Sequence, residues 1–405
     1  MKKLLLKTMS FVLISASAHA QWTLLTPTVS LGDFTSIASN GSTIFAGTTY
    51  YGMMVSSDTG NTWTTANNGL IPAQGIASVR TNGSTIYAGA GNGVFISTNN
   101  GSSWNATSMT TQVYCMEVSG NTIFAGGNTH NLQRSTDGGS TWASVQGNGL
   151  GANSVYCVLI DGSNIYVGIQ QGGIYKSTDN GNTFSKLTAS PNYQINALAK
   201  IGTTIFTGTQ GNGVYKSTDG GATWATTNSS GWLGTGLYAY SFGVIGSDLF
   251  VGNGLISDDV YLSTDNGNTW TDEMSGIPAY SSKVVISFGF GGNYAFAAVH
   301  DNSSGPGNLW RRKLSDMGIS VGIKGYDEKN KVLIYPNPVN EQFSIQLSND
   351  KNTSAEIVNL EGRVLKKISL QTGKTIVNTD GLAKGIYFVR VISAEGTSIQ
   401  KIIKE

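Results

Sequence analysis

An eight-residue segment recurs along this chain and constrains its fold more than any other feature. The first copy, at residues 56–63, reads SSDTGNTW, and five similar segments follow it; we call these six segments boxes. Their acidic position is occupied, at intervals of 38 to 46 residues, by Asp58, Asn99, Asp137, Asp179, Asp219 and Asp265. This period is that of one four-stranded blade of a β-propeller, so the sequence predicts a series of small sheets.

A second signature precedes each box and occurs once more than the boxes do. Its first copy reads IFAG at residues 44–47, and its aromatic position is occupied by Phe45, Tyr87, Phe124, Tyr166, Phe206, Phe250 and Phe296. No box follows the last copy, where the chain reads LWRR at residues 309–312. Because residues 21–25 resemble the segment after each box, we expect this N-terminal strand to complete the seventh sheet and close the ring.

Small residues recur ahead of each signature, and each is followed by an apolar residue. The small residues are Ser36, Ser78, Cys115, Cys157, Ala197, Ser241 and Ser287. This alternation is typical of a β-strand, and small side chains suit strands that converge on an axis. We therefore predict that these strands are the innermost of their sheets, and that the two cysteines are small buried residues rather than a disulfide.

Composition and the first residues indicate an exported, all-β protein. The chain has 53 Gly and only 12% charged residues, which is typical of short strands joined by turns. It begins with MKK, continues through an apolar stretch and reaches AHA at residues 18–20, which predicts a secretory signal cleaved before Gln21. No later segment offers ~20 uninterrupted apolar residues for a membrane span. The net charge of +1 disfavours nucleic acid as a partner.

These patterns divide the chain into four predicted segments. They are a signal peptide at 1–20, a seven-bladed β-propeller at 21–317, a linker at 318–331 and a C-terminal domain at 332–405. The last segment is richer in charged residues, which marks the boundary. The predicted fold class is all-β: a seven-bladed propeller closed by its N-terminal strand, followed by a small Ig-like antiparallel β-sandwich.

The boxes resemble the Asp-box repeats of sialidases, sortilin-type receptors, xyloglucanases and the photosystem assembly-factor family. The resemblance covers roughly residues 34–275 and implies a propeller, but it does not imply one activity. Sialidases carry an arginine triad and an Arg-Ile-Pro motif, whereas this propeller has only Arg80, Arg134, Arg311 and Arg312 and no such motif. Asp and Ser/Thr oxygens suit a tight turn, so we predict that the box carboxylates are structural and not catalytic.

Metal and cofactor sites are not predicted. A calcium loop of the EF-hand type needs a Glu eleven residues after its first Asp, whereas Gly276 stands at that distance from Asp265. His130 and His300, the histidines that remain after signal removal, lie in different repeats and are expected to be exposed loop residues.

A ligand of the propeller is expected at one mouth of its channel, where the loops before the innermost strands and between the second and third strands gather. Aromatic and amide side chains there suit stacking on sugars and hydrogen bonding to them, although solvated loops are polar in any case. Arg80 and Glu117 occupy the same position of adjacent repeats and are predicted to form an ion pair across the channel; the favoured role is structural, and the alternative is a catalytic or ligand-binding pair. The candidate ligand-binding residues are Tyr50, Tyr51, Asn92, His130, Gln170, Gln210, Trp232 and Asp301.

The C-terminal segment has short alternating strands and four motifs in order. The residues expected to carry a sorting signal are Tyr335, Pro336, Asn337, Pro338, Gly385, Tyr387, Lys401 and Lys404. The segment resembles the type A C-terminal sorting domain of the type IX secretion system in Bacteroidetes-type bacteria. The resemblance implies recognition by an outer-membrane translocon after periplasmic export, and removal of the domain on passage. The propeller would then be released or held at the outer-membrane surface.

Three functions are consistent with these residues. The favoured one is a secreted, non-enzymatic propeller that binds a glycan or a protein. The alternative is a glycoside hydrolase of sialidase or xyloglucanase type, which needs two carboxyl groups roughly 5–10 Å apart at one mouth. Asp258, Asp259 and Asp301 are the acids expected there, and only a pair that includes Asp301 has suitable geometry. The third is an adhesive surface protein without a defined pocket.

Overall fold

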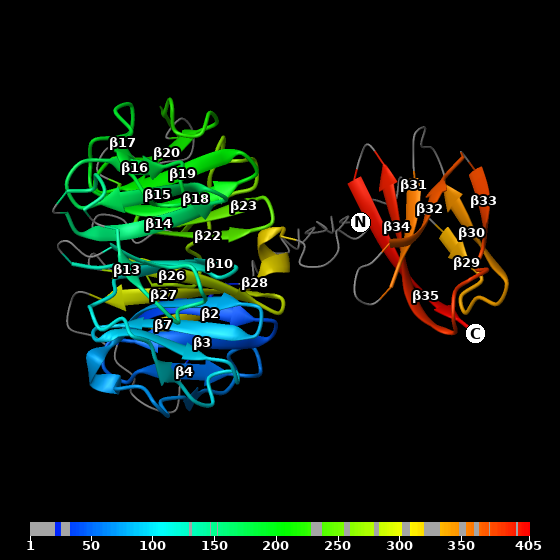
Figure 1. Cartoon of the computed structure of the whole chain (residues 1–405), viewed down its shortest axis with the longest axis horizontal. Coiled ribbons are helices and arrows are strands. Elements are labelled where there is room, and N and C mark those ends of the chain that lie inside the picture. The colour runs from blue at the N-terminus through cyan, green and yellow to red at the C-terminus, as the bar shows by residue number, and fades with distance from the viewer. Residues whose placement is uncertain are drawn as a thin grey trace, which may run out of the picture. The chain divides into compact units, whose positions relative to one another are not determined.

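A computed structural model describes residues 21–25, 33–128, 132–145, 147–151, 153–227, 237–254, 260–278, 283–301, 308–319, 333–347, 354–359, 364–371, 373–393 and 396–405. The predicted signal peptide lies outside these residues. Internal contacts divide the chain into two compact units, Met1–Ile319 and Ser320–Glu405. The first holds the repeats and the second holds the predicted sorting residues (Figure 1).

The described residues of the first unit form seven antiparallel sheets of four strands each. The first strand of each sheet is one of β2 (Phe34–Asn40), β6 (Ile76–Asn82), β10 (Cys115–Ser119), β14 (Val155–Asp161), β18 (Ile195–Ile201), β22 (Ser241–Ile245) and β26 (Lys283–Gly291). The second strands are β3 (Thr43–Thr48), β7 (Thr85–Ala90), β11 (Thr122–Gly126), β15 (Asn164–Ile169), β19 (Thr204–Thr209), β23 (Asp248–Gly252) and β27 (Tyr294–Asp301).

The outer half of each sheet contains a short strand on either side of the box. The third strands are β4 (Met53–Ser56), β8 (Gly93–Ser97), β12 (Leu132–Ser135), β16 (Ile174–Ser177), β20 (Gly213–Ser217), β24 (Val260–Ser263) and β28 (Asn308–Lys313). The outermost strands are β5 (Thr64–Thr65), β9 (Asn105–Ala106), β13 (Ala143–Ser144), β17 (Ser185–Lys186), β21 (Ala225–Thr226), β25 (Thr271–Asp272) and, on β28, β1 (Thr23–Leu25). Two short 3-10 helices are η1 (Pro72–Gln74) and η2 (Leu314–Met317).

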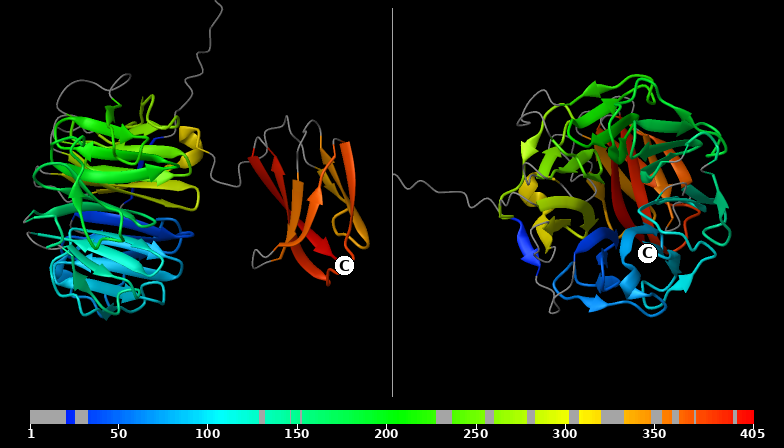
Figure 2. Two further views of the ribbon diagram at one scale, coloured as in Figure 1. Left: turned by 45° about the horizontal axis from the view of Figure 1, so that its top comes forward. Right: turned by 90° about the vertical axis from the view of Figure 1, so that its left-hand side faces the viewer.

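The first strands lie side by side around a common axis, which Figure 2 shows in its right-hand view. Each contacts the first strand of the next sheet, and β26 contacts β2. Glycines on the second strands permit this approach: a Cβ added to Gly47 would lie 2.8 Å from the carbonyl oxygen of Ile76, at the start of the next sheet. A side chain there would push neighbouring sheets apart, so packing favours glycine at this position of the first six sheets; the seventh sheet has Ala298 instead.

A side-chain polar contact joins the innermost strands at each of the seven junctions. Five junctions use the predicted small residues, which bond to the backbone of the next strand, through the pairs Ser36–Val79, Cys115–Val155, Cys157–Ile195, Ser241–Val285 and Ser287–Ile37. The β6–β10 junction uses the Arg80–Glu117 ion pair, and the β18–β22 junction uses the Asn196 amide, which donates to the carbonyl of Ala239, just before β22. At the last junction the N–H of Ile37 donates to Ser287 Oγ, 3.0 Å away.

Cationic side chains also join neighbouring sheets, on their outer halves. Arg134 Nη1 donates to the carbonyl of Asn180 (2.6 Å) in the following box. Arg311 Nη1 makes the equivalent bond from β28 to the carbonyl of Thr59 (2.6 Å), in the first box. Thr59 adopts a left-handed backbone (φ 58°), which orients this carbonyl although such a conformation is costly for a β-branched residue. The last sheet therefore contacts the first by the same device that joins internal sheets.

The N-terminal strand occupies the outer edge of the last sheet. Thr23, Leu24 and Leu25 pair with Arg311, Trp310 and Leu309 of β28. Trp22 is buried, its indole N–H donates to the carbonyl of Glu273 (2.7 Å), and its backbone N–H donates to Ser275 (2.9 Å). Trp104 of the second box makes the same two bonds, to Ala66 and Asn68, with the sheet before it.

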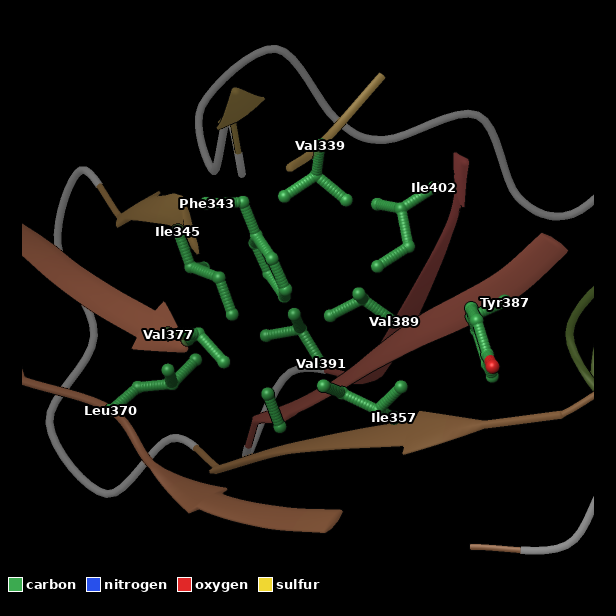
Figure 3. Close-up of a cluster of buried hydrophobic side chains, with 11 residues drawn as sticks. Val339, Phe343, Ile345, Ile357, Leu370, Val377, Tyr387, Val389, Val391 and Ile402 are labelled. Atoms are coloured by element: carbon green, nitrogen blue, oxygen red, sulfur yellow. The ribbon is translucent and has the colours of Figure 1, made fainter. Parts of the chain in front are cut away.

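The second unit consists of two antiparallel sheets. One has the order β29 (Leu333–Tyr335), β30 (Gln342–Leu347), β33 (Gly373–Asn378), and the other has the order β32 (Val364–Ser369), β31 (Ser354–Val358), β34 (Gly385–Ser393), β35 (Gly396–Lys404). Their buried core includes Val339, Phe343, Ile357, Val389 and Ile402 (Figure 3). Among the described residues of the whole chain, no helix is long and apolar enough to span a membrane.

Replacing Trp22 tests the attachment of the N-terminal strand. We expect Trp22→Ala to lower the free energy of unfolding by about 3–5 kcal/mol, because it leaves a cavity and removes the bond to Glu273. Leu24→Ala, on the same strand but 39% exposed, should cost less than about 1 kcal/mol. Chemical denaturation followed by circular dichroism measures both values, and equal values would contradict the packing of Trp22.

Candidate functional site

A cavity of about 650 Å³ runs between the innermost strands of the first unit. All seven first strands contribute lining residues, and the lining includes the small residues of the sequence pattern. The cavity is therefore built from the junctions between sheets, and the boxes do not line it. Its chemistry depends on the side chains that flank the small residues.

In four of the seven sheets, a tyrosine or an amide stands one position before the small residue of the first strand. Tyr114 directly precedes β10, and Tyr156 lies on the neighbouring strand β14; their rings are stacked, with a centroid separation of 6.2 Å and an interplanar angle of 24°. Tyr240 also lines the cavity and stacks on Tyr238 (6.2 Å, 14°). Burial raises the pKa of Tyr156 and of Tyr240, so both hydroxyls stay protonated at neutral pH. Asn196 lies between the two tyrosine pairs in strand order and completes this end of the cavity.

The candidate loops lie at the same end of the sheets as these tyrosines. Backbone bonds of 2.9–3.1 Å join the loops to the segments that lead into the first strands, through the pairs Thr49–Asp33, Gly91–Gln74, Gln170–Ser154 and Gln210–Gln194. Tyr50 and Tyr51 are exposed, as are Gln170 and Gln210. Asn92 is partly buried, and its Oδ1 has no hydrogen-bond partner among the described residues.

Several predicted residues cannot be placed in this arrangement. His130 and Trp232 lie outside the described residues, as do Asp258, Asp259 and the side chain of Asp301. The prediction that His300 is an exposed loop residue is wrong. It lies in β27, is partly buried, and its Nδ1 is 2.9 Å from Oδ2 of Asp33, just before β2. The histidine therefore contributes another contact between the last and first sheets.

Charged side chains lie further along the first strands than the tyrosines. Arg80 Nε is 3.1 Å from Glu117 Oε2, which confirms the predicted ion pair. Lys200 forms a second ion pair with Asp161 between β18 and β14. Glu117 is the one carboxylate among the described residues that line the cavity, and Arg80 neutralises it. A pair of free carboxyl groups, which hydrolysis of a glycosidic bond requires, is not formed by these residues.

The two cysteines are buried and free. Each thiol lies 3.7 Å from a carbonyl oxygen of the next first strand. Burial raises the pKa of Cys115 to about 12, and burial also raises the pKa of Cys157. Neither forms a thiolate at neutral pH, so these side chains serve packing between sheets and are poor nucleophiles.

The carboxylate oxygens of the boxes accept hydrogen bonds from within their own turns. In the first box, Ser56 Oγ donates to Asp58 Oδ1 (2.8 Å) and accepts from the N–H of Gly60 (2.7 Å). Asp58 also accepts the N–H and the hydroxyl of Thr62, at 2.9 and 2.7 Å. The pKa of Asp58 is lowered to about 2, and the hydrogen bond from the N–H of Thr62 contributes most to this shift. Hydrogen bonds of the same kind give a pKa of about 2 to Asp137, Asp179, Asp219 and Asp265.

The second box shows that the turn does not need a charge. Asn99 Oδ1 accepts the N–H of Ser103 (2.9 Å), as a carboxylate would, and its Nδ2 donates to Ser103 Oγ (2.8 Å). In the first box the Thr62 hydroxyl donates to the Asp58 carboxylate, whereas in the second box the Ser103 hydroxyl accepts from the Asn99 amide. The turn is the same in both boxes. A structural role explains why an amide is accepted at this position.

The predicted sorting residues fall at two places in the second unit. Tyr387 is buried, and its hydroxyl donates to the carbonyl of Ala383 (2.8 Å), close to Gly385, whose backbone has φ 156°. Asn337 is exposed, and its side chain bonds to the last strand: Nδ2 donates to the carbonyl of Lys401 (2.8 Å), and Oδ1 accepts the N–H of Ile403 (2.9 Å).

The other sorting residues surround Asn337. Tyr335 is 40% exposed and donates its hydroxyl to Gln346 Oε1 (2.8 Å). Pro336, Pro338 and Lys401 are exposed, and the Lys404 ammonium donates to the carbonyl of Asn340. Motifs at the two ends of the unit therefore meet in space.

Sequence reasoning overlooked the cavity tyrosines. Tyr114, Tyr156 and Tyr240 stand one position before Cys115, Cys157 and Ser241 of the small-residue pattern. The repeat alignment already contained this signal. The ligand site was predicted at the loops, whereas the residue at the rim of each first strand lines the cavity directly.

A fold of small sheets around a channel, joined to a unit with sorting motifs, defines a secreted β-propeller protein. Residues 333–405 match the family model of a secretion system C-terminal sorting domain. Residues 120–233 match the model of a DUF6242 beta propeller domain. No curated protein matches the chain. The sorting domain indicates export to the cell surface or the medium by the type IX machinery.

Solved propellers of low sequence identity share the fold. The GH74 xyloglucanase from Xanthomonas campestris superimposes with a TM-score of 0.58 at 16% identity, covering 81% of this chain but only 59% of the enzyme. YCF48 from Cyanidioschyzon merolae has a TM-score of 0.54 at 14% identity, covering 73% of this chain and 99% of YCF48. The GH74 enzyme of Niastella koreensis has a TM-score of 0.52 at 17% identity, covering 95% of this chain and 74% of the enzyme. These likenesses concern the fold alone.

The box carboxylates should make stability depend on acid pH. The hydroxyl and N–H of Thr141 hold the pKa of Asp137 at about 2, below the ordinary value of about 3.9. Because the folded-state pKa is lowered, this stabilisation is complete above about pH 4 and is lost as the pH falls toward 2. We expect Asp137→Asn to reduce the fall in Tm between pH 4 and pH 2.

The reciprocal variant, Asn99→Asp, should make the same fall steeper. Thermal unfolding between pH 6 and pH 2 measures both slopes. Parallel curves for the parent chain and the two variants would show that the turns do not hold ionised carboxylates.

Proposed function

We propose that this chain is a non-enzymatic, secreted propeller of seven blades, closed by its N-terminal strand, that binds a neutral glycan at the tyrosine-lined end of its channel. The observation that carries the proposal is the pair of tyrosine stacks, Tyr114–Tyr156 and Tyr238–Tyr240, with three of these rings lining one cavity. Flat aromatic faces pack against the apolar faces of sugar rings, and amides satisfy sugar hydroxyls. The exposed tyrosines and glutamines of the nearby loops extend the same chemistry outward.

Charge supports a neutral ligand over an anionic one. The cationic side chains of the described cavity lining, Arg80 and Lys200, are both engaged by carboxylates. An acidic sugar would find no uncompensated cation among these residues, and its own desolvation would then disfavour binding. The site also differs in this respect from a sialidase site, which uses an arginine triad, because Arg80 is paired with Glu117.

A binding role accounts for the carboxylates better than hydrolysis does. The box carboxylates are held in turns, and Glu117 is paired with Arg80. A xyloglucanase and a YCF48 bound to a D1 peptide are among the proteins of similar fold. The first of these proteins is named for a polysaccharide substrate and the second is bound to a peptide; the tyrosine stacks favour a sugar as the ligand here.

Binding of neutral oligosaccharides to the purified full-length protein tests the proposal. After a glycan array has selected a ligand, Tyr156→Ala should weaken its Kd about 10-fold in calorimetry, because a stacking face is lost. Tyr156→Phe keeps the face and should stay within about 3-fold of the parent. Tyr335→Ala removes an exposed tyrosine of the other unit and should leave the Kd unchanged.

Two results would contradict the proposal. One is that no neutral oligosaccharide binds, whether or not acidic glycans or peptides do. The other is that a selected oligosaccharide binds Tyr156→Ala as tightly as the parent chain.

A further inference from the structure

The first and last segments of the sorting domain form one structural element. The Asn337 side chain uses both of its polar atoms on β35, as a neighbouring strand would use its backbone. The N–H of Val339 donates to the carbonyl of Ile403 (2.7 Å), and the N–H of Glu405 donates back to the carbonyl of Val339 (2.9 Å). Four hydrogen bonds therefore join segments that are more than 60 residues apart in the sequence.

Buried and exposed side chains have separate tasks in this element. Val339 and Ile402 are fully buried in the same core cluster, where they anchor the two segments (Figure 3). The side chains of Tyr335, Pro336, Pro338 and Lys401 are instead exposed. Lys374 extends this surface, since its ammonium lies 5.4 Å from the centroid of the Tyr335 ring. Exposed aromatic and proline side chains contribute little to the core and are suited to contact with a partner.

The family match gives this surface a partner. The sorting-domain model covers residues 333–405, so it begins and ends in the two segments that meet. A protein of the export machinery must recognise this domain. Both polar side-chain atoms of Asn337 are bonded to the last strand. The export machinery therefore meets this asparagine within the folded domain and not within an unstructured linear segment.

We propose that the export machinery recognises a single composite surface, formed by Tyr335, Pro336 and Pro338 together with Lys401, and assembled by the Asn337 clasp on β35. The signal exists only in the folded domain. Loss of the last residues abolishes export by dissolving this surface, and the terminal residues alone are not sufficient.

Export of full-length variants from a bacterium with a type IX system tests this proposal. Asn337→Ala removes both side-chain bonds of the clasp. Tyr335→Ala alters the surface and leaves the clasp in place. Asn340→Ala is the matched control, because this exposed asparagine of the same segment contributes its backbone carbonyl to Lys404 and Thr379. Thermal unfolding of each purified full-length variant reports whether the domain stays folded.

Both Tyr335→Ala and Asn337→Ala should reduce the exported fraction at least 10-fold and leave protein in the periplasm, whereas Asn340→Ala should export like the parent. Tyr335→Ala should do so without a change in unfolding. If Asn337→Ala unfolds the domain, Tyr335→Ala decides the question alone. Normal export of Tyr335→Ala, with export lost on deletion of residues 401–405, would overturn the proposal and identify a linear terminal signal.

Discussion

The junction between neighbouring first strands is the contact on which the rest of the first unit depends. A sheet of four short strands has two apolar faces and cannot bury them alone, so it is stable only between two neighbours. Glycine at the IFAG signature lets the neighbours approach, and small residues such as Ser36 bond across the gap. Seven junctions each have such a polar contact, including the one between β26 and β2.

This construction separates the scaffold from the ligand site. The box carboxylates accept hydrogen bonds within their own turns, and their low pKa reflects that saturation rather than readiness for proton transfer. The cavity instead receives the side chains at the rims of the first strands, and their residue type differs from sheet to sheet. Tyr114, Tyr156, Asn196 and Tyr240 occupy a position that the other three repeats fill with Thr35, Ala77 and Ile286. Variation at the three tyrosine positions can create a binding surface, whereas Asn196 also makes the polar contact at the β18–β22 junction.

Patterns that repeat along the sequence predicted much of this architecture. The box interval indicated four-stranded sheets, and the shared position of Arg80 and Glu117 indicated their ion pair, because repeats convert sequence position into spatial position. Residues outside the repeats carried no such information. His300 looked like a loop residue because its partner Asp33 is distant in the sequence, and the bonds of Asn337 to β35 join residues that no local pattern relates.

The site was predicted less well than the fold for the same reason. Loop residues such as Tyr50 and Gln170 were chosen for their chemistry, and they do lie at the tyrosine-lined end of the sheets. The tyrosines of the cavity itself were not predicted, because the small-residue pattern marks Cys115 and Cys157 and assigns no role to the positions before them. Which rim residue faces the cavity depends on how the strands converge, and this is a property of the assembled sheets.

Hydrogen exchange of two backbone amides tests the central claim most directly. The N–H of Val79 donates to Ser36 at an internal junction, and the N–H of Ile37 donates to Ser287 at the junction between the last and first sheets. If the ring is closed by equivalent contacts, the two amides should exchange at protection factors within about 10-fold of each other, since both open only when sheets separate. Ile37 exchanging at least 1,000-fold faster than Val79, on the order of 4 kcal/mol less protection, would show that the ring is open between β26 and β2.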